Sequence, residues 1–269
     1  MEKVTRSGAS QSEAISDYKF PTETIDLPSK GKLYESDHPL ADGTIEIKYM
    51  TAREEDILTS QNLINKGIVL DKLVESIIVT DVNVDDIVVG DKNAILLSSR
   101  IMAYGPEYSA RVTCPECSNV ETVEVDLSAL ENKDVDLPDG HGNSFGLKLP
   151  QSGKEITFKI LTHGDSRKID AEIETWDRLN KNSETPSSEM SVRYKFIITS
   201  VDGETSKVKI KAFVRDGLTL KDSRELKRRM REMSPGVDQT FDFSCSRCDF
   251  TERLNIPFGI DFFWPTEEL

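Results

Sequence analysis

Four cysteines are the residues of this 269-residue chain whose spacing most clearly predicts chemistry. They form two pairs, Cys114 with Cys117 and Cys245 with Cys248, each separated by two residues. A turn of this length points both sulfurs toward one point, and two such turns supply the four thiolates of a tetrahedral zinc site. We therefore predict that Cys114, Cys117, Cys245 and Cys248 bind one structural Zn²⁺ per chain. Four thiolates fill the coordination shell, which leaves no open position for catalysis.

Other uses of the cysteines fit the sequence less well. A redox pair usually opens a helix after a strand, whereas the alternating residues 120–125 and 250–256 predict a strand after each pair. A disulfide needs an oxidising compartment, and because the sequence shows no secretory signal we expect a reducing cytosol. Two incomplete metal sites or free thiols remain as alternatives.

The segments before the cysteine pairs indicate an internal duplication. Residues 87–127 overlay residues 218–258 without a gap at a constant offset of 131, which superposes the two cysteine pairs. Asp91 then matches Asp222, and each is expected to N-cap a helix. The alternative is that any two strand–helix–hairpin units would have helix caps and turns at similar positions.

Two earlier segments repeat as well. Residues 27–32 (LPSKGK) return as 149–154 (LPQSGK), and residues 45–51 return as 156–162. The second repeat predicts a strand followed by a helix that Thr51 or Thr162 caps.

The sequence thus predicts an α+β fold of two similar strand–helix–hairpin halves that share a zinc-ribbon-like four-cysteine site. The expected segments are a flexible arm over residues 1–17, a first half over 18–130 with the first knuckle, a linker loop over 131–143, and a second half over 144–269 with the second knuckle and an aromatic C-terminal tail.

Composition limits the function. A net charge of −14 argues against general nucleic-acid binding, and no apolar run is long enough to span a membrane. Residues 207–231 are an exception, because they are strongly basic. They fit a solvated helix face, an acidic partner or, last, nucleic acid. Residues 163–166 (HGDS) lack the flanking glycines of a hydrolase nucleophile motif and are better explained as a helix start, so we expect no enzyme activity.

Several short motifs together resemble the baseplate hub proteins of contractile-tailed, T-even-like bacteriophages. They are residues 27–34 (LPSKGKLY), 45–51 leading into 54–58, the two cysteine knuckles, and 257–265 (PFGIDFFWP). The resemblance implies a non-enzymatic virion or assembly protein whose partners are other hub, tail tube or tape-measure proteins. It also implies a place in the virion tail baseplate, or in the host cytoplasm during assembly, and oligomerisation within that assembly. The alternative function is a zinc-ribbon module that binds nucleic acid or the transcription machinery.

Overall fold

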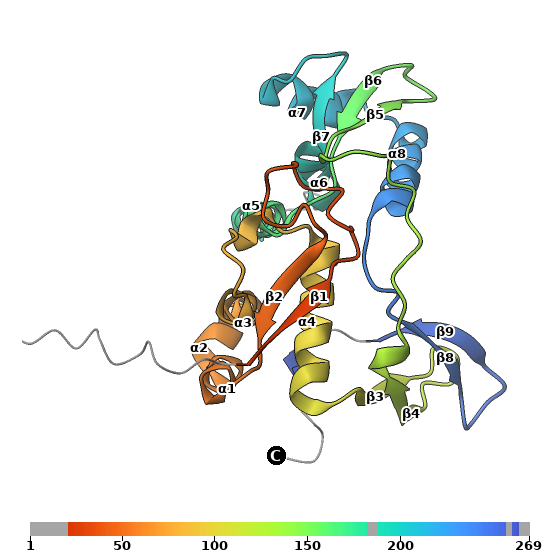
Figure 1. The fold of residues 1–269 in the computed structure, drawn as a ribbon. Coiled ribbons are helices and arrows are strands. Elements are labelled where there is room, and N and C mark those ends of the chain that lie inside the picture. Colours follow the sequence, from red (N-terminus) through yellow and green to blue (C-terminus); the bar gives the residue numbers. More distant parts are fainter. Residues whose placement is uncertain (1–20, 182–187, 257–259, 264–269) are drawn as a thin grey trace, which may run out of the picture.

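The computed structural model describes residues 21–181, 188–256 and 260–263 (Figure 1). It combines helices with small antiparallel sheets, which confirms the predicted α+β class. The expected flexible arm over residues 1–17 lies outside the described residues.

In the first half of the chain, the described residues form four α-helices and two hairpins. In order, these elements and two short 3-10 helices are β1 (Thr22–Asp26), β2 (Thr44–Lys48), α1 (Ala52–Thr59), α2 (Gln61–Asn65), α3 (Val69–Ile77), η1 (Val84–Asp86), α4 (Val89–Tyr104), β3 (Glu107–Thr113), β4 (Val120–Asp126) and η2 (Leu127–Ala129).

The second half follows the same general order. It comprises β5 (Phe145–Lys148), β6 (Glu155–Phe158), α5 (His163–Asn180), α6 (Glu189–Ile197), β7 (Ile198–Val201), α7 (Lys207–Asp216), α8 (Leu220–Met233), β8 (Thr240–Ser244), β9 (Thr251–Asn255) and η3 (Ile260–Phe263). The sheets β1–β2, β3–β4 and β8–β9 have two strands each, and β5–β6–β7 has three.

The helices α1 and α5 begin in the same way. Thr51 caps α1, as predicted, and also forms a capping box with Glu54. Lys48 Nζ donates to Glu54 at 2.8 Å. The same contacts recur around α5, where Thr162 and Asp165 form the capping box and Lys159 donates to Asp165. All three pairs of positions are separated by 111 residues.

The first of these capping boxes predicts an acid-sensitive contact. Burial alone would raise the pKa of Glu54, but hydrogen bonds from Lys48, Ser76 and Thr51 outweigh it and hold the pKa at about 2. This stabilisation is present above the unfolded pKa of about 4.5 and is lost as the pH falls toward 2. We expect Glu54→Gln to lower the free energy of unfolding at pH 7 by about 2–3 kcal/mol.

Urea unfolding between pH 7 and 2 checks this expectation. The Glu54→Gln protein should lose less stability than wild type across that range, because it no longer carries the ionised group. Glu55→Gln is the matched control, since Glu55 is an exposed neighbour on the same helix. If the free energy of unfolding changed with pH in the same way for wild type and Glu54→Gln, the hydrogen bonds would not stabilise the ionised Glu54 carboxylate.

The prediction that Asp91 and Asp222 are N-caps is wrong. The N-caps are Val88 and Thr219, and each aspartate lies three residues further on. There its carboxylate accepts hydrogen bonds from a distant loop, and that of Asp222 also accepts from Thr219 Oγ1 at 2.9 Å. Asp91 binds the backbone N–H of Ser29 at 2.9 Å, and Asp222 binds that of Gln151 at 2.7 Å. A buried carboxylate needs such donors, and local spacing cannot show that a loop 62 or 71 residues away supplies them.

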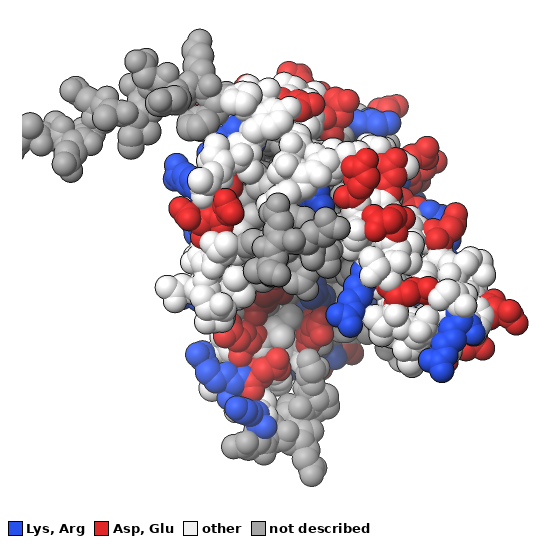
Figure 2. All heavy atoms as spheres, turned by 90° about the horizontal axis from the view of Figure 1, so that it is seen from below, with Lys and Arg blue, Asp and Glu red and all other residues white. Residues whose placement is uncertain are grey.

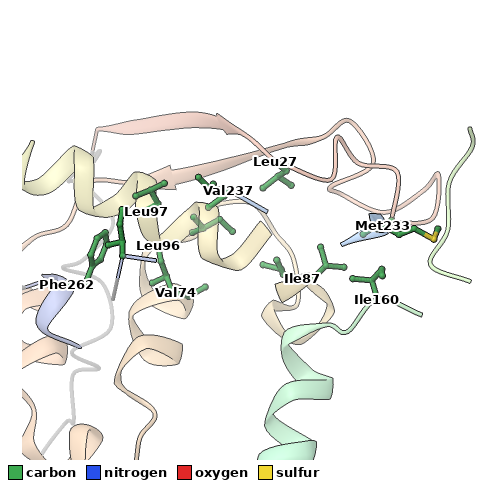
Figure 3. Packing of buried hydrophobic residues seen from close by; sticks show 14 of the residues in the cluster. Leu27, Val74, Ile87, Leu96, Leu97, Ile160, Met233, Val237 and Phe262 are labelled. Carbon is green, nitrogen blue, oxygen red and sulfur yellow. The ribbon is translucent and has the colours of Figure 1, made fainter. Parts of the chain in front are cut away.

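The buried side chains of both halves form one hydrophobic cluster (Figure 3). Ile87 from the first half lies near Ile160 and Met233 from the second in this view. Backbone bonds reinforce the contact, because His163 N donates to Ile87 O at 2.7 Å and Val89 N donates to Leu161 O at 3.1 Å. The halves are therefore packed together along α4 and the start of α5.

One segment then leaves the first cysteine hairpin after η2, and another leads from the end of α8 into the second hairpin. Residues 131–136 of the predicted linker run beside residues 232–238, and backbone bonds connect them from Lys133 N to Gly236 O and from Asp238 N to Glu131 O, both at 2.8 Å. The two segments run together along one edge of the molecule in Figure 1. This pairing delivers β8–β9 to the same end as β3–β4.

Candidate metal centre

The first cysteine pair lies in the turn of the β3–β4 hairpin. The strands pair from Glu107 with Asp126 to Thr113 with Val120, so the turn begins directly after Thr113. Cys114 N donates to Asn119 O at 2.8 Å and Ser118 N donates to Cys114 O at 3.0 Å. These two bonds close a tight loop that turns both sulfurs to one side.

The second pair occupies the corresponding turn of β8–β9. The last strand pair is Ser244 with Thr251, and Cys245 N donates to Phe250 O at 3.0 Å. Arg247 N also points at Cys245 Sγ, 3.4 Å away. Both predicted strand–knuckle–strand units are therefore present.

The four sulfurs converge although the pairs are 131 residues apart. Cys114 Sγ lies 3.7 Å from Cys248 Sγ, and Cys117 Sγ lies 3.6 Å from Cys245 Sγ. All four sulfur atoms lie within 4.8 Å of one another, and all four cysteines are free thiols. Ligands at about 2.3 Å from a tetrahedral zinc are separated by about 3.8 Å, so this spacing fits a four-thiolate metal site.

The thiols also affect one another electrostatically. Burial would raise the pKa of Cys114, but hydrogen bonds from the backbone of Cys117 and Glu116, and from the thiols of Cys117 and Cys245, outweigh it and lower this pKa to about 7. A backbone bond to Phe250 lowers the pKa of Cys248, but burial and the three neighbouring sulfurs raise it to about 12. Four thiolates this close repel one another, and a bound cation is what allows all four to ionise together.

Contacts around the cluster fix the two hairpins relative to each other. Cys114 is buried and the other three cysteines are half-buried. Ser246 N donates to a Glu121 carboxylate oxygen at 3.2 Å, which connects the second knuckle to β4. Within the second hairpin, the ring of Phe250 packs on that of Phe243, with the centroids 6.3 Å apart. The arrangement can hold a metal ion and join two hairpins.

A second connection between the hairpin end and α4 has no clear signal in the sequence. Arg100 is buried, and its Nε donates to the carbonyl of Phe262 at 3.0 Å while Nη1 donates to that of Gly105 at 3.1 Å. The guanidinium also lies 4.8 Å from the ring centroid of Tyr104. An arginine in a helix is ordinarily expected to be exposed to solvent. Only the tertiary structure therefore shows that Arg100 anchors η3.

The histidine of the HGDS segment is buried between charged side chains at the start of a helix. His163 is buried at the start of α5, with Nδ1 3.1 Å from Lys92 Nζ and Nε2 3.4 Å from Asp71 Oδ1. Burial, and then the charge of Lys92, lower the pKa of His163. The segment begins α5, as predicted from the sequence, and its Asp165 forms the capping box with Thr162.

These features define an α+β protein with a candidate four-thiol metal centre between two hairpins. In the described part of the chain, no helix has the length and apolar character needed to cross a bilayer. The model of the family described as T4 bacteriophage base plate protein matches residues 20–264. The chain belongs to this family, as the sequence motifs predicted. No match was found among curated proteins or solved structures.

Proposed function

We propose that the chain is a non-enzymatic structural or assembly component of the baseplate hub, stabilised by one structural Zn²⁺. The ligands are Cys114, Cys117, Cys245 and Cys248. The observation that carries the proposal is the convergence of two distant cysteine pairs in a chain of a phage baseplate family. A filled four-thiolate shell leaves the ion a role in holding the fold, and the chain then acts through its surfaces.

The metal would clamp two duplicated halves, residues 18–130 and 144–269, joined by the linker 131–143. Two sets of matched contacts support the duplication. The Lys48–Glu54 and Lys159–Asp165 pairs recur at an offset of 111, and the Asp91 and Asp222 carboxylates each accept from the loop that follows a Leu-Pro pair. Neither half completes the metal site alone.

Metal content tests the site directly. Protein purified without chelator is expected to contain about one zinc per chain, because two cysteines from each half make one four-ligand site. Elemental analysis of the wild-type protein gives this number, with Arg247→Ala as a control that alters the knuckle but no ligand. A zinc content near zero per chain would show that the cysteines do not bind zinc. A content near two would show that the two cysteine pairs do not share one ion.

The role in assembly needs a separate test. We expect the protein to co-sediment with tails or tail intermediates from infected-cell lysates, through contacts with other hub, tail tube or tape-measure proteins. Localisation in the virion tail baseplate, or in the host cytoplasm during assembly, follows from this role. Binding to DNA or RNA that weakens steeply with salt, without tail association, would favour the nucleic-acid alternative.

A further inference from the structure

A basic face lies open along α8, on a chain whose net charge is −14. Its exposed cations recur at helical spacing on one side and line a groove of about 610 Å³ beside Pro150. They are Lys221, Arg224, Lys227, Arg228 and Arg231. We call this surface the α8 basic face. Its position at the edge of the molecule leaves it accessible (Figure 1).

Most of these charges are not neutralised within the described chain. Arg228 is an exception, since it pairs with Glu225 and Glu232. Lys227 lies over the ring of Tyr194, 5.9 Å from its centroid. Lys221, Arg224 and Arg231 form no ion pair with any residue that the structure describes. A row of uncompensated cations of this kind attracts an acidic surface.

The α8 basic face also carries an apolar anchor. Leu220, the first residue of α8, is 85% exposed. An exposed leucine beside a groove of cations fits a protein surface better than a free anion, because an ion cannot bury it. The preferred partner is therefore polypeptide with acidic and apolar side chains together.

The β3–β4 hairpin of the same chain has this chemistry. Its carboxylates are mostly exposed, and they are Glu107, Glu116, Glu121, Glu124 and Asp126. Those of Glu124 and Asp126 accept from the serines Ser109 and Ser128. Val120, at the start of β4, is 47% exposed. In Figure 2, which views the molecule from below, Asp and Glu side chains are prominent on the surface, with Lys and Arg side chains among them.

We propose that the α8 basic face binds the β3–β4 hairpin of a second copy of the chain. The two surfaces are different and lie toward different ends of the molecule in Figure 1, so the contact is head-to-tail. A head-to-tail contact repeats from copy to copy and generates a ring or a filament. This inference goes beyond the proposed function, because it names a self-association contact that does not involve the metal ligands.

Sedimentation velocity at increasing protein concentration tests the contact. The wild-type chain at 0.15 M salt should form species larger than one chain, and these should dissociate at 1 M salt, where the screening length falls to about 3 Å. The triple variant Arg224→Glu, Lys227→Glu, Arg231→Glu should weaken association by about 100-fold, because it sets like charges against the hairpin. The neutral variant with alanine at the same positions guards against a folding defect.

Two further arms make the result specific. Arg53→Glu, Lys66→Glu, Lys168→Glu makes the same change in net charge at exposed positions away from α8 and should associate like wild type. The hairpin variant Glu107→Lys, Glu124→Lys, Asp126→Lys should fail to associate alone. A mixture of the hairpin variant with the α8 triple variant should associate again. The unchanged α8 basic face of the first then meets the unchanged β3–β4 hairpin of the second.

A wild-type chain that stays monomeric at all concentrations overturns the proposal. So does association that the α8 variants leave intact, or binding of the α8 face to duplex DNA in place of a second copy. Zinc content is measured on the same samples. Failure of the self-contact with zinc present thus remains distinct from failure of the metal site.

Discussion

Replacement of Cys245 by serine is expected to loosen both cysteine hairpins at once, not only the hairpin that carries the change. The sulfur of Cys245 lies 3.6 Å from that of Cys117, and the four sulfurs form one cluster. Structural zinc sites contribute about 10–16 kcal/mol in apparent terms, and closing a loop of this length costs about 4–5 kcal/mol. Loss of one ligand therefore releases a connection between segments that are far apart in the sequence.

Amide hydrogen exchange separates this outcome from a local defect. Protection should fall in both β3–β4 and β8–β9 in the Cys245→Ser protein, and chelator should produce the same pattern in wild type. The double variant Cys117→Ser, Cys245→Ser should lose about as much stability as either single variant, because the three proteins lack the same site. Arg247→Ala is the knuckle control and should keep wild-type protection. Loss confined to β8–β9 would contradict a clamp shared between the halves.

The Phe262→Ala substitution should lower the free energy of unfolding by about 3–5 kcal/mol. Phe262 is fully buried, and its ring packs against Tyr108 with centroids 5.0 Å apart. Its carbonyl accepts from the buried Arg100. The expected loss combines a cavity with weaker placement of η3, which leaves the Arg100 charge without one of its acceptors.

Chemical denaturation and a double-mutant cycle with Arg100→Leu measure this coupling. The two changes should be non-additive by more than about 0.5 kcal/mol, because the residues contact each other. Phe213→Ala is the matched control, since Phe213 is only partly buried on α7, and it should cost less. Equal losses for Phe262→Ala and Phe213→Ala, with additive effects at Arg100, would show that η3 is not an anchor.

The Phe262 anchor and the cysteine cluster act on the same part of the molecule. The cluster joins β8–β9 to β3–β4, while the segment after β9 returns to α4 through Phe262 and Arg100. The second half is thus attached to the first at both ends of its terminal hairpin.

The sequence by itself determined the features that depend on near neighbours. The spacing of Cys114 and Cys117, and the alternating strands beside them, were enough to predict a knuckle in a hairpin. Thr51 and Thr162 were recognisable as caps because their partners lie three residues away. The family, and the α+β class, also followed from short motifs and periodicity.

Only the tertiary structure decided which distant groups meet. It set Cys114 against Cys248 and Cys117 against Cys245, and it turned Asp91 from the expected cap into an acceptor for Ser29. It also buried Arg100, which a sequence pattern would leave in solvent. Hydrogen bonds and packing across long separations depend on how the elements pack together, and that packing is not encoded in local spacing.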